Sequence, residues 1–168
     1  MHPSGKSYVY FSKNAANRYT PDNSPFGVLY GAVDIETALF EVFGDEMFEN
    51  DHRIRAFRWK GYSISRVLVP QVRVCALADN GTRASLKVDL GTLMGQDFTV
   101  TRAWALAIMD HPAQVHGLIY TSRFTQRHCL ALFDRGSMSS QVSEDLIGQL
   151  HAVKEANQFL DDHRCVIV

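Results

Sequence analysis

Residues 26–43, FGVLYGAVDIETALFEVF, decide the fold class of this 168-residue chain. The first part, residues 26–33, is apolar enough to form a buried strand. Asp34 follows at the position of a helix N-cap, where its side-chain oxygen can accept a hydrogen bond from a free backbone amide. Apolar residues then recur at helical spacing, namely Ile35, Ala38, Leu39, Val42 and Phe43. The sequence therefore predicts a buried strand that leads directly into an amphipathic helix.

The flanking sequence predicts further strands and helices that do not alternate strictly. Strands are expected at 8–11, 53–59, 62–69, 72–77, 117–120, 130–133 and 165–168. Thr101 is expected to cap a helix that ends before His111-Pro112. A long helix is expected to open at Ser139, Ser140 and Glu144, with Leu146, Ile147, Leu150 and Val153 as its apolar stripe. Residues 14–25 and 79–95 are predicted loops, the second with room for one short helix. This order predicts an α+β fold, a single domain over residues 1–168 with a mixed central β-sheet flanked by helices.

Composition limits the classes of partner. Apolar residues make up 46% of the chain, which is enough for one full-sized core. The net charge of -1 supplies no overall field to attract nucleic acid or an anionic membrane. No apolar run approaches the roughly 20 residues of a membrane span, and no export signal is visible. Cys75, Cys129 and Cys165 show no paired spacing and are expected to be reduced thiols. We therefore expect a cytoplasmic protein that contacts neither nucleic acid nor membranes directly.

Metal and common nucleotide motifs are missing from the sequence. The seven histidines are scattered, without H-E-x-x-H or a His–Cys cluster, so no metal site is predicted. A G-x-G-x-x-G loop and a Walker loop are both lacking. The basic residues of 53–60 alternate with apolar ones, which indicates the solvent face of a strand more than an RNA-binding surface.

A first group of candidate site residues is Arg18, Tyr19, Tyr30 and Glu41. A guanidinium, an aromatic face and a carboxylate can hold a pyrophosphate, stack on a flat ring and stabilise positive charge on a ribose. Helix phase places Glu41 at the flank of the apolar stripe, where it can face a cleft. Ordinary roles remain open: Arg18 could pair with Asp22, Tyr30 could belong to the core, and Glu41 could be an exposed helix carboxylate.

A second candidate is the segment YTSR at 120–123, at the end of a predicted strand. Strand ends often present polar groups to ligands, and the Ser122 hydroxyl can donate and accept hydrogen bonds. A nucleophilic serine is not expected, because no G-x-S-x-G elbow or neighbouring His–acid pair surrounds it. The alternative is an ordinary strand-end hydroxyl that caps backbone groups.

Taken in order, these motifs resemble the RES-domain family, the toxins of RES–Xre toxin–antitoxin systems, named for an Arg, a Glu and a Ser. The matching segments are NRYTP at 17–21, GVLYGA at 27–32, TALFE at 37–41, GLIYTSR at 117–123 and LALFD at 130–134. They span most of the chain, and the eleven-residue step from Tyr30 to Glu41 adds specificity. The resemblance implies an ADP-ribosyltransferase-like fold.

The resemblance also implies an activity: an NAD glycohydrolase or phosphorylase that cleaves the nicotinamide–ribose bond and acts as a bacterial toxin. By this resemblance Arg18 holds the phosphates, Tyr30 stacks on the nicotinamide, Glu41 stabilises an oxocarbenium-like ribose and Ser122 orients the substrate. Tyr19, Arg123 and His128 are further expected substrate contacts. No cofactor or metal is required, since NAD is the substrate, with inorganic phosphate as co-substrate in the case of phosphorolysis.

The expected protein partner is an Xre-type antitoxin, and a homodimer is left open. Two departures from the family pattern keep other functions open. Many relatives carry an Arg on the first strand, whereas residues 8–11 have none. Either the sequence is a domain cut from a longer protein, or Lys6 or Lys13 substitutes imperfectly. His128-Cys129 stand where an Asn is common. The alternatives are an ADP-ribosyltransferase that modifies a macromolecule and a catalytically inactive partner-binding module.

Overall fold

The stretch that decides the fold class forms the strand and the helix expected of it. The computed structural model describes residues 1–5 and 9–168. Strand β2 (Val28–Ala32) is followed by helix α1 (Ile35–Glu49). Asp34 is the N-cap, and its Oδ1 accepts a hydrogen bond from the Thr37 backbone amide at 2.7 Å. This cap satisfies a helix amide and ends the strand, so the chain turns from sheet to helix within two residues.

The main sheet has four strands in the order β2-β7-β6-β5. Beside β2 lie β7 (His128–Phe133), β6 (Gly117–Thr121) and the short β5 (Cys75–Ala76). β2 and β6 are antiparallel to β7, whereas β5 runs parallel to β6. The sheet is therefore mixed, which confirms the α+β prediction.

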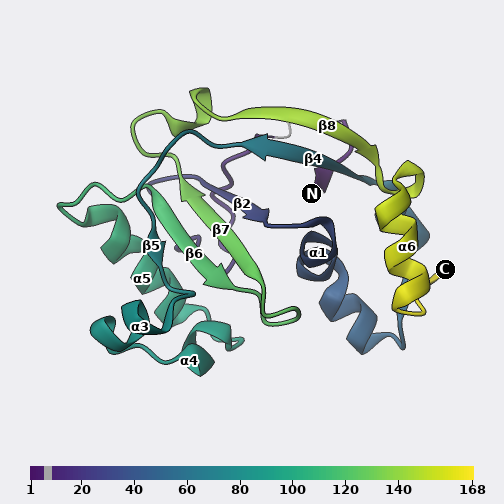
Figure 1. Ribbon diagram of the computed structural model, residues 1–168, viewed down its shortest axis with the longest axis horizontal. Helices are drawn as coiled ribbons and strands as arrows, with labels where there is room; N and C mark the ends of the chain where they lie inside the picture. Colours follow the sequence, from purple (N-terminus) through teal and green to yellow (C-terminus); the bar gives the residue numbers. More distant parts are fainter. Residues whose placement is uncertain (6–8) are drawn as a thin grey trace.

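A long two-stranded ribbon connects this sheet to the other side of the molecule. β4 (Tyr62–Leu68) pairs antiparallel with β8 (Ser143–Gln149), and β1 (His2–Pro3) adds to the far edge of β4. Figure 1 shows the ribbon passing over the main sheet towards α6 (Lys154–Asp162). A small parallel pair, β3 (Arg53–Ile54) and β9 (Val166–Ile167), fastens the C-terminus near the end of α1.

The remaining elements are short helices. They are α2 (Ala56–Lys60), α3 (Asn80–Leu86), α4 (Leu90–Met94), α5 (Thr99–Asp110), and the 3-10 turns η1 (Met138–Ser140) and η2 (Leu150–Ala152). One core cluster packs α5 against the main sheet, and a second packs α1 against α6, η2 and β4. A third lies between the opposite face of the main sheet and the ribbon. The junction of β2 and α1 therefore lies between the first two clusters.

Residues 143–149 are a strand, so the predicted long helix over this region is wrong. β8 pairs with β4 from Leu68↔Ser143 to Ser63↔Gln149, with a register shift between Ile64 and Ser65. Of the proposed helical stripe, Leu146 and Ile147 are 52% and 44% exposed. The next α-helix along the chain, α6, begins only at Lys154. Pairing with a strand far away in the sequence overrides the local helical spacing here.

The predicted strand at 53–59 is also wrong beyond Ile54, because α2 follows at once. The buried carboxylate of Glu46 on α1 stabilises this helical turn. Glu46 Oε1 accepts hydrogen bonds from the Arg55 backbone amide at 3.1 Å and from Arg55 Nε at 2.8 Å, and Arg58 Nη1 donates to Oε2. Arginines three apart reach one carboxylate from a helical turn, not from the solvent face of a strand.

Other boundaries differ by smaller amounts. The predicted loop at 79–95 contains two helices, α3 and α4, which Asp79 and Asp89 cap through the amides of Thr82 and Thr92. Helix α5 begins two residues before Thr101. Residues 9–11 form no strand, although Ser12 makes a single antiparallel bridge with Val28. Lys6 and Tyr8 lie outside the described residues.

Within residues 1–5 and 9–168, every helix is too short or too polar to cross a bilayer.

We predict that the Glu46 contacts stabilise the fold in a pH-dependent manner. Burial alone would raise the pKa of the Glu46 carboxyl, but hydrogen bonds from Arg55 and Arg58 hold this pKa below its ordinary value. A depressed pKa stabilises the fold above the unfolded value of 4.5 and loses that effect as the pH falls through the folded value. Glu46→Gln should therefore lower the free energy of unfolding by about 2 kcal/mol at neutral pH, the size of a hydrogen bond to a charged group.

Urea unfolding at pH 7 and at pH 3.5 measures this difference for the wild type and Glu46→Gln. We expect the two proteins to approach one another at the lower pH, because the unfolded state then binds a proton that the ionised Glu46 carboxylate of the wild-type fold resists, and this reduces the stabilisation. A difference that stays the same at both values would contradict the ionic role of Glu46.

Candidate active site

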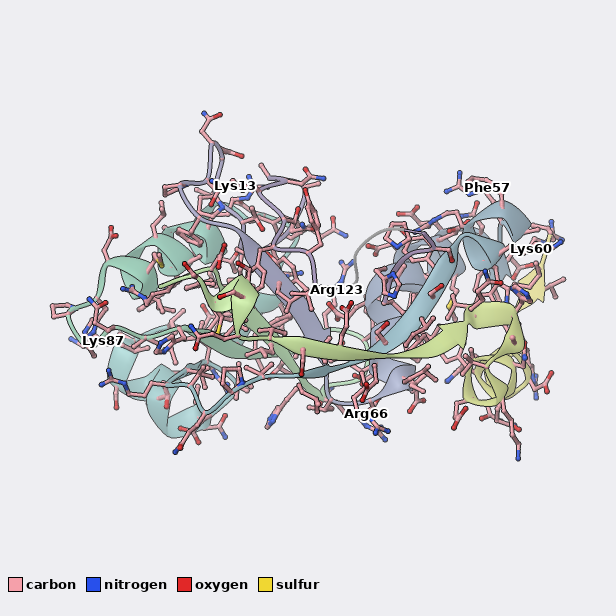
Figure 2. All side chains as sticks on the ribbon, turned by 90° about the horizontal axis from the view of Figure 1, so that it is seen from above. Lys13, Phe57, Lys60, Arg66, Lys87 and Arg123 are labelled. Atoms are coloured by element: carbon pink, nitrogen blue, oxygen red, sulfur yellow. The ribbon has the colours of Figure 1, made fainter. Side chains whose placement is uncertain are left out.

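A cleft of about 300 Å³ opens where β2 leads into α1. Four of the predicted site residues line it, Arg18, Tyr30, Glu41 and Arg123. Figure 2 shows Arg123 near the middle of the molecule, between its two halves. Two larger cavities, of about 560 and 550 Å³, involve residues of the main sheet and the β4 side, and are lined mostly by other residues. The smaller cleft is therefore the one that brings most of the predicted site residues together.

Glu41 and Ser122 are brought together although 81 residues separate them. The Ser122 hydroxyl donates a hydrogen bond to Glu41 Oε1 at 2.7 Å. It also accepts from the backbone amides of Phe124 at 3.3 Å and Thr125 at 3.4 Å. Ser122 is 0% exposed and does not line the cleft, whereas Glu41 is exposed there. The serine thus orients the carboxylate, and the direct substrate contact expected of Ser122 has no support in this geometry.

The whole loop between β6 and β7 lies along α1. The contacting pairs are Arg127 with Asp34, Thr125 with Thr37, Ser122 with Glu41, Phe124 with Gly44, and Arg123 with Asp45. Gly44 is required by the closeness of this approach, because a Cβ there would lie 2.7 Å from the Phe124 ring. The ring stacks between Phe40 at 6.0 Å and Phe48 at 5.8 Å. One wall of the cleft is therefore a loop fixed on a helix.

The opposite wall carries Arg18. Its Nη1 donates to the carbonyl oxygens of Leu93 at 2.7 Å and Gly95 at 2.6 Å, and its guanidinium lies 4.7 Å above the Phe98 ring. The Thr101 hydroxyl donates to the Arg18 carbonyl oxygen at 2.7 Å. The cation is consequently held in one orientation at the start of α5. The alternative ion pair with Asp22 does not form, since Asp22 pairs with Arg102 at 3.1 Å.

Tyr30 on β2 holds the loop that carries Arg18. Its hydroxyl accepts a hydrogen bond from the Tyr19 backbone amide at 3.0 Å and lies 2.9 Å from Thr20 Oγ1. Burial raises the pKa of the Tyr30 hydroxyl to about 12, so the group stays protonated at neutral pH. Since Tyr30 also lines the cleft, β2 places an aromatic side chain there and fixes the Arg18 loop at the same time.

Two predicted substrate contacts lie elsewhere. Tyr19 is fully buried and packs on Tyr120 with ring centroids 5.0 Å apart. Its hydroxyl has no hydrogen-bond partner within the described part of the chain. His128 is exposed at the start of β7 and lines one of the two larger cavities. Arg18 and Tyr19 lie in a turn, and the Tyr19 side chain packs into the core although its neighbour Arg18 lines the cleft.

Among the charged and aromatic residues that line the cleft, Asp45, Phe98 and Phe124 were not predicted as site residues. Asp45 follows Glu41 by one helical turn, so i,i+4 spacing was a usable signal for it. Tyr120 belongs to the predicted segment at 120–123 and also lines the cleft. Phe98 comes from a separate segment, and no local pattern marks it as a site residue.

The arrangement suits a ligand that has both anionic and cationic parts. One wall presents an oriented guanidinium, the other presents a carboxylate held by a hydroxyl, and aromatic rings lie between them. Across the described ranges 1–5 and 9–168, the structure has no group of three or more side chains able to hold a metal ion. The side chains themselves can bind a pyrophosphate and stabilise a developing positive charge.

Comparison with known proteins agrees with this picture at the level of fold and family. The chain is similar in structure to a chain of the crystal structure of the M. tuberculosis MbcT-MbcA toxin-antitoxin complex, with a TM-score of 0.72. The similarity covers 97% of this chain and 86% of that chain at 11% sequence identity, which shows the fold alone. No curated protein sequence matches this one. The RES domain family model matches residues 3–151, and the chain therefore belongs to the RES domain family.

Proposed function

We propose that this protein is an NAD-degrading enzyme that cleaves the nicotinamide–ribose bond, as a glycohydrolase or a phosphorylase, and acts as a bacterial toxin. The observation that carries the proposal is the Glu41 carboxylate, held by Ser122 and facing the same cleft as Arg18 and Tyr30. Membership of the RES domain family supports the same assignment. Its structural relative comes from a toxin-antitoxin complex.

Arg18 binds the pyrophosphate in this proposal. Because Nη1 is committed to the Leu93 and Gly95 carbonyls, Nε and Nη2 are the donors that meet phosphate oxygens. Fixing one nitrogen orients the guanidinium plane before substrate arrives, which lowers the entropy lost on binding. Tyr30 and Tyr120 supply aromatic surface against which the nicotinamide ring packs.

Glu41 stabilises the ribose as the bond breaks. The C1″–N1 bond cleaves with both electrons passing to the nicotinamide ring nitrogen, which becomes neutral and needs no acid. The carboxylate faces the positive charge that develops at C1″, and water or phosphate then forms the new C–O bond there. In hydrolysis the displaced proton leaves to solvent. The Ser122 hydrogen bond keeps Glu41 in position without neutralising its charge.

As a toxin, the protein acts in the cytoplasm by lowering NAD. We propose an Xre-type antitoxin as the partner, which inhibits by covering the cleft between Arg18 and Tyr30. That the structural relative comes from a toxin-antitoxin complex supports an antitoxin as the partner.

The proposed activity is tested by incubating the purified chain with NAD and measuring nicotinamide by chromatography, with and without phosphate and with and without cell lysate. Release in buffer or with phosphate supports the proposal. Release only with lysate would indicate ADP-ribosyl transfer to a macromolecule. No release under any condition would favour an inactive binding module.

Glu41→Gln should lower the rate of nicotinamide release by about 100-fold or more, because the amide cannot stabilise the oxocarbenium charge. The melting temperature should stay unchanged, since the side chain is exposed and Gln still accepts a hydrogen bond from Ser122. Glu49→Gln on the same helix is the matched control and should behave as the wild type. A folded Glu41→Gln protein with full turnover would rule out the assigned role.

Arg18→Lys should raise the Michaelis constant for NAD by about tenfold, because a point charge cannot bind the carbonyls and a pyrophosphate together. Arg18→Ala should raise the Michaelis constant for NAD further, because it removes the cation altogether. Arg73→Lys, at an exposed arginine outside the cleft, is the control. Loss of activity with unchanged melting supports a substrate contact, whereas equal loss of activity and stability would indicate a structural role alone.

Expression of the active chain in a bacterial cytoplasm should lower NAD and arrest growth, and Glu41→Gln should do neither. Cellular NAD and growth rate are measured together with the amount of soluble protein. Normal NAD at high soluble expression of the wild type would count against the toxin assignment.

A further inference from the structure

Arg123 is the second arginine among the described residues that line the cleft. It follows Ser122, which holds the Glu41 carboxylate, and both Arg123 and Glu41 line the cleft. Its guanidinium packs 4.5 Å above the Phe124 ring, and its side chain is only 24% exposed. Nη2 donates to both carboxylate oxygens of Asp45, which also lines the cleft. The cation near Glu41 is therefore already paired.

Asp45 lies one helical turn beyond Glu41, so α1 presents two carboxylates to the same cleft. A phosphate ion that attacked the ribose beside Glu41 would need a cation to offset their repulsion. Arg18 is assigned to the pyrophosphate, and Arg123 is neutralised by Asp45. The Arg123 N–H groups that donate to Asp45 are the same kind of donor that would bind a phosphate ion. Water carries no charge and meets no such barrier.

We propose that Asp45 makes the nucleophile subsite selective for water over inorganic phosphate, so that the reaction is hydrolysis. This inference rests on the proposed function and narrows it. In hydrolysis the C1″–N1 bond breaks with its electron pair on nicotinamide, and a water oxygen bonds to C1″ and loses a proton to solvent. The products are nicotinamide and ADP-ribose. In phosphorolysis a phosphate oxygen would form the bond and ADP-ribose 1″-phosphate would result.

The test is Asp45→Asn, which keeps the size of the side chain and removes its charge. Wild-type turnover should be insensitive to phosphate and should yield ADP-ribose. In Asp45→Asn, millimolar phosphate should raise nicotinamide release by about tenfold, and mass spectrometry should detect the sugar phosphate. Asp110→Asn, at an exposed position at the far end of α5, makes the same charge change outside the cleft and should remain insensitive. The double variant Asp45→Asn/Arg123→Gln should lose the stimulation.

A second readout does not depend on turnover. Inorganic phosphate, without NAD, should raise the melting temperature of Asp45→Asn but not that of the wild type, Asp110→Asn or the double variant. Wild-type formation of ADP-ribose 1″-phosphate would overturn the inference, and so would an Asp45→Asn protein that neither binds nor uses phosphate. If no variant released nicotinamide, the proposed function would fail, and phosphate binding would still decide whether Asp45 excludes the anion.

Discussion

The site depends on the contact between the β6–β7 loop and helix α1. The loop comes from the main sheet and the helix packs in a different core cluster, so their contact joins the two halves of the molecule. Its centre is the 2.7 Å hydrogen bond from Ser122 to Glu41, next to the Phe124 ring seated on Gly44. Without this contact the carboxylate would have no fixed direction, since Glu41 is otherwise an exposed side chain on a helix surface.

Three acidic residues on α1 show how partners decide the use of a carboxylate. Glu46 is buried and meets two arginines, which makes it a structural ion pair. Asp45 is exposed and pairs with Arg123 at the edge of the cleft. Glu41 has a neutral hydroxyl as its hydrogen-bond donor, so its negative charge remains available to a cationic centre. Electrostatic catalysis needs this third arrangement, because a neutralised carboxylate would stabilise little developing charge.

The Arg18 wall is held by a different set of bonds. The backbone carbonyls of Leu93 in α4 and of Gly95 just after it accept from the guanidinium, the Thr101 hydroxyl donates to the Arg18 carbonyl, and the Tyr30 hydroxyl accepts from the Tyr19 amide. Most of these partners are backbone groups or short side chains, which have little freedom to lose. The cleft is therefore organised without a ligand, which is what the proposed cleavage, driven by positioning and charge, would require.

The sequence by itself determined the β2–α1 unit, the Asp34 cap, the mixed α+β class and the family, because each rests on local spacing or short ordered motifs. It also named Arg18, Tyr30 and Glu41, which share the cleft. Tertiary structure alone decided β8, where pairing with β4 overrides a helical pattern in the sequence. It also decided α2, where Arg55 and Arg58 both bind the Glu46 carboxylate. It alone placed Tyr19 in the core and brought Phe98 to the cleft. Spacing along a chain records which residues can share a face, whereas the direction of a side chain and the choice of a strand partner depend on contacts between residues far apart in sequence.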